Sequence, residues 1–351
     1  RHPTTYESTS SMANAEKNAA LNIPRGVYSS ILPPSMRIPS AAENAQYNLM
    51  YYVKGALSGG ICCAITHGAL TPVDVVKTRM QLDPVKYNKG MIAGFRQVID
   101  GEGAGALLTG FGPTATGYFI QGWFKFGGVE LFKIKTAEAL GPERAWAQRN
   151  NIYLGASALA EFIADIFLCP LEATRIRLVS NPSYAPSMAS AMMKMGKEEG
   201  VLSGFYAGFG PILFKQVPYT MAKFAVQGAA AEKIYASVGS SPEKMSKAGN
   251  VSVSLGSGVV AGVAAAIISH PADTLLSKIN KAGAGGSGGT MTRLVNIAKE
   301  TGIMKLCTQG LGARCIMIGT LTAGQFGIFD TVMGMLGASK FHFHDPSKGH
   351  H

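Results

Sequence analysis

An eight-residue pattern occurs three times in the chain, and this repetition constrains the fold more than any other feature. Each copy has a proline first, an acidic residue two positions later and a polar or basic end. The copies begin at Pro72, Pro170 and Pro271, about 100 residues apart. A period of this length predicts three structural units of one kind, arranged in tandem.

Each predicted unit contains two long apolar stretches. The first stretch precedes the proline, near residues 53–71, 152–169 and 253–269. The second follows a Gly-x-Gly block that begins at Gly110, Gly208 or Gly310 and continues for about 25 residues. Because a helix needs ~20 residues to cross the hydrocarbon core, three units with two stretches each predict six transmembrane helices.

The composition favours a membrane protein with a polar interior and an anionic partner. Only 15% of the 351 residues are charged, whereas soluble domains have about 25%. A mean hydropathy of +0.15 is too low for helices that are apolar on every face. The net charge of +11 favours an acidic lipid or an anionic substrate. Nucleic acid is excluded as a partner because the chain has no nucleic-acid-binding motif.

The remaining segments complete the predicted organisation. Short amphipathic pieces lie between the two apolar stretches of each unit, near residues 91–101, 185–199 and 290–301, and basic residues gather around them. The positive-inside rule places these connections on the inner side of the membrane. The predicted domains are a polar, proline-containing arm (1–46), three repeats (47–140, 141–240 and 241–337) and a tail (338–351). The five cysteines show no metal-type spacing and are predicted to be buried thiols.

The second helices carry polar residues at matching positions. Alignment on the Gly-x-Gly blocks gives three trios: Lys125 with Lys223 and Gln325, Gln121 with Tyr219 and Leu321, and Gly117 with Lys215 and Met317. Steps of four residues keep each helix's members on one face. Since a lysine at membrane depth must face water, an acid or an anion, these faces are predicted to line a cavity. Arg314 adds a fourth cation beside the third block.

The first helices bring titratable residues to the same cavity. Alignment on the prolines matches His67 with Asp165, and Cys63 with Glu161. Glu161 and Asp165 are four residues apart, on one face of an otherwise apolar run. Lysine ammonium groups are point charges that suit a compact tetra-oxygen anion. The sequence therefore predicts an anion site with proton-accepting neighbours. Simple ion pairing with the lysines is the alternative role for both carboxylates.

The triplicated pattern P-x-[DE]-x-x-[KR]-x-[KR] resembles the signature of the mitochondrial carrier family, over residues 47–337. Within that family the chain is most similar to the phosphate carriers. The strings that carry the likeness are THGALTPVDVVKTRMQLDPVKYNKGM from Thr66, GFGPTATGYFIQGWFKFGG from Gly110, AEFIADIFLCPLEATRIRL from Ala160, PILFKQVPYTMAKF from Pro211 and HPADTLLSK from His270. The resemblance implies an all-α, six-helix barrel with pseudo-threefold symmetry and short amphipathic helices on the matrix side.

The resemblance also implies a matrix gate of ion pairs beside the three prolines, which are expected to kink their helices. By analogy with the family, Asp74 is expected to pair with Arg175, and Asp273 with Lys77. Glu172 is left without a base because Leu276 occupies the matching position, so the ring is incomplete. Lys278 ends the third copy of the pattern. At the opposite gate, Glu130 and Lys133 fit the family pattern, but Gln227 does not, and Asp330 has no base three residues later.

The function implied is symport of inorganic phosphate with a proton, or the equivalent exchange for hydroxide, by alternating access. The predicted substrate-binding residues are Gln121, Lys125, Lys215, Tyr219, Lys223, Arg314 and Gln325. The predicted proton-coupling residues are His67, Thr78, Glu161 and Asp165. Gly110, Gly208 and Gly310 begin helices whose free N–H groups can hold lipid phosphates, and the resemblance implies cardiolipin there. No other cofactor is expected.

Three alternatives remain open at this point. One is a carrier for another small anion, such as a dicarboxylate. Another is a carrier fold that serves as a non-transporting subunit of a larger inner-membrane complex, which would hold the N-terminal arm. The third, a membrane enzyme, lacks support because the sequence shows no nucleophile–base pair, metal cluster or cofactor motif.

Overall fold

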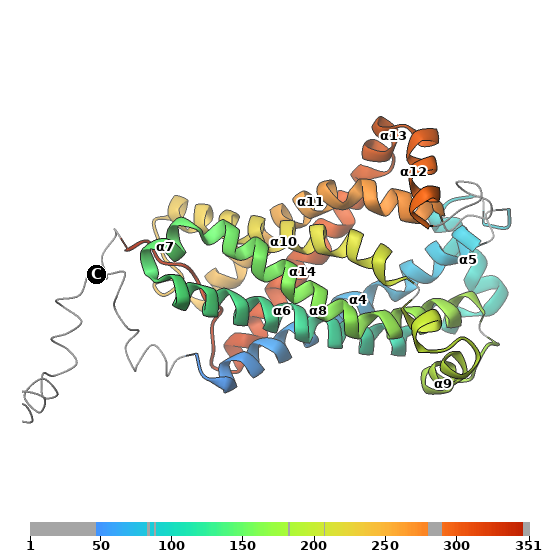
Figure 1. Cartoon of the computed structure of the whole chain (residues 1–351), viewed down its shortest axis with the longest axis horizontal. Coiled ribbons are helices and arrows are strands. Elements are labelled where there is room, and N and C mark those ends of the chain that lie inside the picture. The colour runs from blue at the N-terminus through green and yellow to red at the C-terminus, as the bar shows by residue number, and fades with distance from the viewer. Residues whose placement is uncertain are drawn as a thin grey trace, which may run out of the picture.

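The computed structural model describes residues 47–82, 85–87, 89–181, 183–206, 208–279 and 290–346, and all long elements in these ranges are helices. Six helices of 25 to 34 residues run side by side along the long axis of the molecule (Figure 1). They are α4 (Leu49–Leu82), α6 (Phe111–Leu140), α8 (Arg149–Ser180), α10 (Phe209–Val238), α11 (Lys247–Ile279) and α14 (Leu311–Met335). The predicted all-α architecture with two long helices per repeat is confirmed.

The six long helices form a closed ring. Each packs against its two neighbours in the order α4, α6, α8, α10, α11 and α14, and α14 returns to α4. A closed ring encloses the faces that carry the aligned polar residues, and this positions the candidate site at its centre.

Four segments of the described residues are long and apolar enough to cross a membrane. Three of them lie within α4, α8 and α11, and the fourth runs from Ile303 to the end of α14. Helices α6 and α10 are also 30 residues long. Both carry lysines in their apolar stretches, among them Lys125 and Lys223, and these lower the hydropathy. The buried polar faces that weaken the hydropathy signal are thus the same faces that line the interior.

The shorter helices distinguish the two ends of the ring. Helices α5 (Met91–Glu102), α9 (Met188–Glu198) and α12 (Thr290–Thr301) gather at one end, called the α5 end below (Figure 1). They match the three predicted amphipathic pieces. The same connections also contain three short helical turns, Ala104–Leu108, Val201–Phe205 and α13 (Ile303–Thr308). Helix α7 (Pro142–Ala147) lies at the opposite end, the α7 end, where α6 turns into α8.

The three repeat prolines lie inside α4, α8 and α11, and these helices continue through them. Helix α10 holds a further internal proline, Pro218, which the repeat alignment did not single out. A proline removes one backbone hydrogen bond of its helix, so all four helices contain a locally weakened turn.

Glycines allow close contact within two helix pairs. A Cβ atom added to Gly262 of α11 would lie 2.7 Å from the Cα atom of Gly319 on α14, and one added to Gly258 would lie 2.8 Å from the Cα atom of Ala323. On α4, Gly59 meets the backbone of Gly122 on α6 in the same way. At these positions the absence of a side chain lets the helix backbones meet. At Gly55 of α4, in contrast, an added Cβ atom would meet nothing within 4 Å.

The predicted arm of residues 1–46 lies outside the described residues. The tail is described as far as Pro346. Three of the five cysteines are buried, as predicted, whereas Cys307 and Cys315 are partly exposed.

Candidate anion-binding site and its two closures

Two carboxylates from α8 lie at the centre of the ring, and one amide holds both. Glu161 and Asp165 are fully buried, at 0% exposure. The Nε2 atom of Gln121, on α6, donates to Oε1 of Glu161 at 2.9 Å and to Oδ1 of Asp165 at 3.4 Å. The second carboxylate oxygen of Asp165 is buried and has no hydrogen-bond partner among the described residues. Two neighbouring buried acids, one of them with an unpartnered oxygen, can hold a proton between them.

Lys125 neutralises one of these two carboxylates. Its Nζ atom lies 3.0 Å from Oε2 of Glu161, and both side chains are at most 5% exposed. Thr220, on α10, donates a hydrogen bond of 2.9 Å to the same oxygen. Sequence reasoning missed Thr220 because it lies beside the aligned polar face and not on it. Glu161 is therefore the anchored acid, and Asp165 is the one with unused acceptor capacity.

Lys223 is the cation without an acidic neighbour. Its side chain is 1% exposed, and no carboxylate of the described residues lies within 4.0 Å of its Nζ atom. Its hydrogen-bond acceptor is Oε1 of Gln325, on α14, at 3.0 Å. Four aromatic rings surround the ammonium group at 4.9 to 5.8 Å: those of Phe126, Phe224, Phe326 and Tyr219. Ring faces attract a cation without neutralising it. The buried charge of Lys223 is thus available to an anion.

His67 joins the two halves of this centre. Its Nε2 atom lies 3.2 Å from Nε2 of Gln325, and its ring stacks on Tyr118 with centroids 3.6 Å apart. The sequence predicted His67 within the cavity but gave no indication of the stacking partner. The contact with Gln325 connects His67 to Lys223 through one amide group.

The other predicted substrate residues occupy different places. Tyr219 is buried, with its hydroxyl 3.5 Å from the hydroxyl of Thr322. Lys215 and Arg314 lie nearer the α5 end, where both face Asp273, Lys215 at 3.8 Å and Arg314 in direct contact. Arg314 also donates to Ser269 at 3.0 Å. Arg314, predicted as a fourth cation of the substrate site, is thus paired with Asp273 near the repeat prolines, and its role in substrate binding stays a prediction.

The predicted gate near the prolines closes the α5 end in a modified form. The expected pair of Asp74 on α4 and Arg175 on α8 is present at 3.0 Å. The expected partner of Asp273, Lys77, is replaced by Arg314, which projects from the adjacent helix α14. Glu172 is not left without a base, since Arg175 lies 3.0 Å from it across one turn of α8. One arginine thus serves two acids and links the first two repeats.

The remaining gate residues have local partners. The hydroxyl of Thr78 donates to the backbone oxygen of Asp74 at 2.8 Å, and Lys278 donates to Thr301 at 3.0 Å. No ion pair of Lys77 or Lys278 is found within the described residues. Their role in the gate, like the proton-handling role of Thr78, stays a prediction.

The three predicted lipid-binding glycines are the N-caps of α6, α10 and α14 at the α5 end. Gly110 and Gly310 have φ angles of 80° and 82°, a region that favours glycine, whereas Gly208 has a φ of −90°. Their first-turn N–H groups are in the position that suits an anion. The binding of cardiolipin stays a prediction.

The α7 end is closed by a second set of contacts, part of which the sequence did not indicate. Glu130 and Lys133 of α6 form the predicted pair, with Nζ and Oε1 2.5 Å apart. Asp330, which lacked a base in the sequence pattern, is paired at 3.0 Å with Lys340, a residue of the segment that follows α14. The spacing of ten residues gave no signal, because Lys340 has no counterpart in the first two repeats.

A ring of six long helices, four of them in segments apolar enough to cross a membrane, with a charged centre between two closures of ion pairs, is the architecture of a membrane transporter. Family comparison agrees: the model named mitochondrial carrier protein matches residues 49–138, 149–236 and 247–340. The chain belongs to the mitochondrial carrier family. The family and the relatives described next place it in the mitochondrial inner membrane as a multi-pass protein.

The relatives span most of their own length and most of this chain. The mitochondrial substrate carrier family protein N of Dictyostelium discoideum is 52% identical over 289 residues, covering 82% of this chain and 95% of that protein. The mitochondrial phosphate carrier protein of Caenorhabditis elegans is 45% identical and covers 80% of each chain. The solute carrier family 25 member 3 of Homo sapiens is 42% identical, covering 84% of this chain and 80% of that protein.

Proposed function

We propose that this chain transports inorganic phosphate across the mitochondrial inner membrane together with a proton, and that it is not an enzyme. The observation that carries the proposal is the charge of Lys223, which is buried and has no carboxylate within 4.0 Å in the described residues. A charge inside the membrane is costly unless something compensates it. The similarity to phosphate carriers supports phosphate as the compensating anion.

The arrangement around Lys223 fits a tetra-oxygen anion. Lys125 lies on α6, at the matching position of the first repeat. The amide of Gln325 and the hydroxyls of Tyr219 and Thr220 supply neutral polar groups. Phosphate accepts hydrogen bonds on every oxygen, and two lysine ammonium groups approach it as point charges from different directions. Movement of phosphate into this centre offsets the charge of Lys223 and draws Lys125 away from Glu161.

The acids of α8 are the proposed proton carriers. When Lys125 turns to phosphate, Glu161 loses its cation, and only the neutral donors Gln121 and Thr220 then serve the two buried carboxylates. A proton shared by Glu161 and Asp165 then compensates the negative charge that Lys125 no longer neutralises. Asp165 offers the free oxygen that accepts it. His67 is placed to relay the proton, since Gln325 connects it to the anion site.

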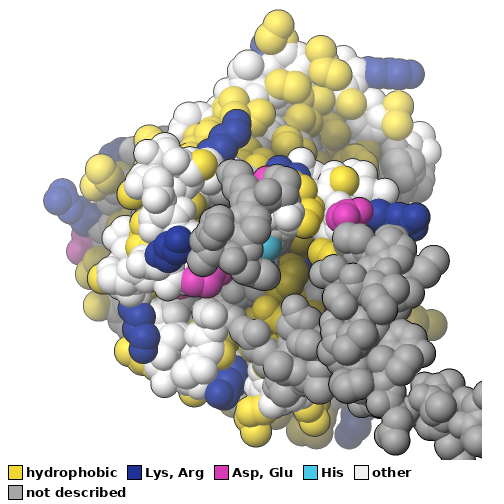
Figure 2. All heavy atoms as spheres, turned by 90° about the vertical axis from the view of Figure 1, so that its left-hand side faces the viewer, with side chains coloured by type: hydrophobic (Ala, Val, Ile, Leu, Met, Phe, Trp, Pro, Cys, Tyr) yellow, Lys and Arg dark blue, Asp and Glu magenta, His cyan; other side chains and the backbone are white. Residues whose placement is uncertain are grey.

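The two closures open in alternation, and this exposes the central site first to one side of the membrane and then to the other. The α5 end faces the matrix in this proposal, and the α7 end faces the intermembrane space, as the basic connections of the repeats indicate. Side chains of Lys and Arg are spread around the rim of the α7 end (Figure 2). With a net charge of +11, such a surface raises the local concentration of anions at the entrance.

Uptake of labelled phosphate into liposomes that contain the purified protein tests the proposal. Uptake is expected to rise with an inward proton gradient and to be lost in Lys223→Ala. The matched control is Lys135→Ala on α6, which removes an exposed lysine paired only with Glu138 and should leave uptake unchanged. If the folded, lipid-bound protein takes up no phosphate either with or without the inward proton gradient, the proposal is contradicted and a non-transporting subunit is favoured. Strong uptake of a dicarboxylate in place of phosphate would favour the other-anion alternative.

A further inference from the structure

The segment that follows α14 lies across the α7 end of the ring (Figure 1). Phe343 is 9% exposed, and its ring contacts those of Tyr153 and Phe341 at 5.4 and 5.1 Å. Phe341 in turn contacts Tyr47, at the start of the described chain, at 5.7 Å. Two aromatic anchors thus hold an irregular segment inside the mouth of the helical ring.

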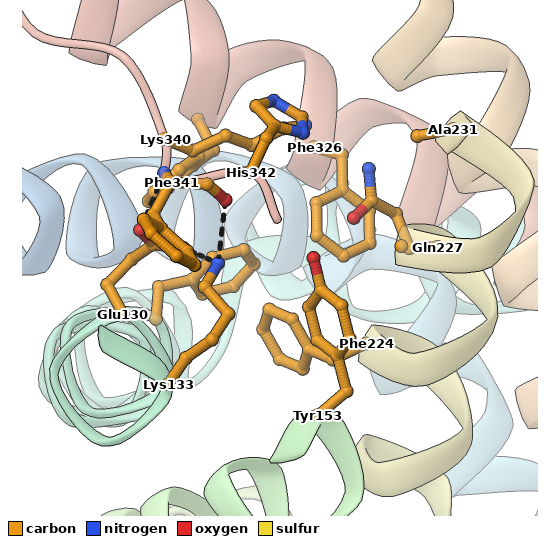
Figure 3. Close-up of a pocket in the computed structure, with 13 residues that line it drawn as sticks. Glu130, Lys133, Tyr153, Phe224, Gln227, Ala231, Phe326, Lys340, Phe341 and His342 are labelled. Carbon is orange, nitrogen blue, oxygen red and sulfur yellow. Dashed lines mark hydrogen bonds and ion pairs between the residues drawn. The ribbon is translucent and has the colours of Figure 1, made fainter. Parts of the chain in front are cut away.

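The backbone of this segment is bound by the acid–base pair of α6. The N–H group of Phe341 donates to Oε2 of Glu130 at 3.0 Å, and Nζ of Lys133 donates to the carbonyl oxygen of Phe341 at 3.1 Å (Figure 3). Tyr51, on α4, donates to the same oxygen of Glu130 at 2.9 Å. Glu130 and Lys133 therefore clamp the backbone of one residue, Phe341, by its N–H and its C=O group. Their other described contacts are with each other and with Tyr51 and neighbouring rings.

Lys340 supplies the base that the third repeat lacks. The position three residues after Asp330 is Met333, which is fully buried and cannot pair with an acid. Lys340 instead reaches back to Asp330 at 3.0 Å and to the hydroxyl of Ser254, on α11, at 2.7 Å. Ser254 also bonds to Asp330. Both charged side chains are only 10 to 11% exposed, so the pair is shielded from solvent.

The covered space lies directly between this segment and Lys223. A cavity of about 20 Å³ is lined by Phe126, Phe224 and Phe326 on one side and by Lys340, Phe341 and His342 on the other (Figure 3). The same three phenylalanine rings lie within 5.7 Å of Nζ of Lys223. A volume of this size holds about one water molecule, which is too little for a tetra-oxygen anion. A solute from the α7 end therefore reaches Lys223 only after the segment has moved.

We propose that residues 338–343 are a plug of the α7 end, and that Lys340 is a gate residue that this plug delivers to Asp330. The inference rests on the proposed function, because an opening at this end has meaning only for a transporter. The closed state contains the contacts of Glu130, Lys133 and Asp330 with the plug, and the open state lacks them. Any change that weakens these contacts shifts the population toward the state open at the α7 end.

The test measures access to the space under the plug and needs no phosphate. Gln227 lines the cavity and is 4% exposed, so the variant Gln227→Cys reports opening through its reaction with a membrane-impermeant maleimide. Gln148→Cys, at the exposed N-cap of α8, is the reference on the same end. Both are placed in a background with Cys307→Ser and Cys315→Ser, which removes the two partly exposed natural thiols.

The expected result is slow labelling of Gln227→Cys, accelerated about tenfold by Lys340→Gln and also by Phe341→Ala, with labelling of Gln148→Cys unchanged. For Lys340→Gln the factor corresponds to the loss of one hydrogen bond to a charged group. Phe341→Ala keeps the backbone contacts and removes the ring contacts with Tyr47 and Phe343. Lys340→Arg should restore slow labelling, and thermal unfolding of each variant shows that the change is not general unfolding. Unchanged labelling of Gln227→Cys in both Lys340→Gln and Phe341→Ala would overturn the plug. Accelerated labelling in a protein without phosphate uptake would retain the plug and overturn the proposed function.

Discussion

Lys223 and Gln325 meet across α10 and α14, with Nζ and Oε1 3.0 Å apart, and the same amide lies 3.2 Å from His67. These two residues occupy matching positions in the second and third repeats, so the symmetry of the fold brings a cation and its neutral acceptor together. Gln325 therefore orients the ammonium group that we assign to phosphate, and it couples that group to an imidazole.

Replacement of Gln325 by leucine should weaken phosphate binding without unfolding the protein. The variant Gln325→Leu removes the acceptor and leaves a buried cation unheld, a loss of about 1.5–3 kcal/mol for a hydrogen bond to a charged group. The KM for phosphate uptake should rise roughly 10- to 100-fold. Uptake kinetics in proteoliposomes measure the change, and Gln148→Leu at the exposed N-cap of α8 is the control. A KM within twofold of the unmodified protein would show that Gln325 does not orient Lys223.

The arginine shared by two acids at the α5 end should couple the first two repeats energetically. A double-mutant cycle with Asp74→Asn and Arg175→Gln is expected to give a coupling of about 0.5–1 kcal/mol, because the pair is only partly exposed. Thermal unfolding in detergent supplies the four stabilities. The matched cycle is Arg177 with Glu199, at 2.6 Å, which lies on the surface and should show less coupling. Additive effects at Asp74 and Arg175 would mean that the contact does not hold the gate.

The sequence predicted most of the interior because the repeat makes three independent copies of each position comparable. The alignment of Lys125, Lys223 and Gln325 required no structure, and neither did the placement of Glu161 and Asp165 on one helical face. The pair of Asp74 and Arg175 came from the family resemblance. In each of these cases the residue lies in a regular helix, so its position in the sequence determines the face of the helix on which its side chain lies.

The contacts that the sequence did not predict break the threefold symmetry. Arg314 reaches Asp273 from the neighbouring helix of its own repeat, and this choice depends on which of several basic side chains is nearest after packing. Lys340 reaches Asp330 from an irregular segment that has no counterpart in the other repeats. This contact depends on the conformation of the irregular segment after α14. A periodic sequence pattern does not predict that conformation.

The close approach of α11 and α14 should make Gly262 intolerant of any side chain. In Gly262→Ala the new Cβ atom would lie 2.6 Å from the carbonyl oxygen of Ile318, so the helices must separate, at a cost of about 1–3 kcal/mol. Gly55→Ala on α4 is the matched control, because its Cβ atom would meet nothing within 4 Å and alanine favours the helix. Thermal unfolding in detergent should show a lower midpoint for Gly262→Ala alone. Equal midpoints for the two variants would mean that α11 and α14 are not in backbone contact.

The plug should loosen in acid, because it carries His342 among cations. Burial, together with the ammonium groups of Lys340 and Lys133 and the neighbouring His344, holds the pKa of His342 well below its ordinary value of 6.5. A base whose pKa is lower in the docked state than in the released state binds fewer protons when docked. The docked plug therefore has its full stability above about pH 6.5, and this stability declines as the pH falls below that value.

The measurement is the ratio of the labelling rates of Gln227→Cys and Gln148→Cys, taken at each pH to cancel the reactivity of the thiol. This ratio should rise on acidification. The variant His342→Gln should flatten this rise, and a ratio that stays constant with pH in the unmodified plug would show that His342 does not govern docking.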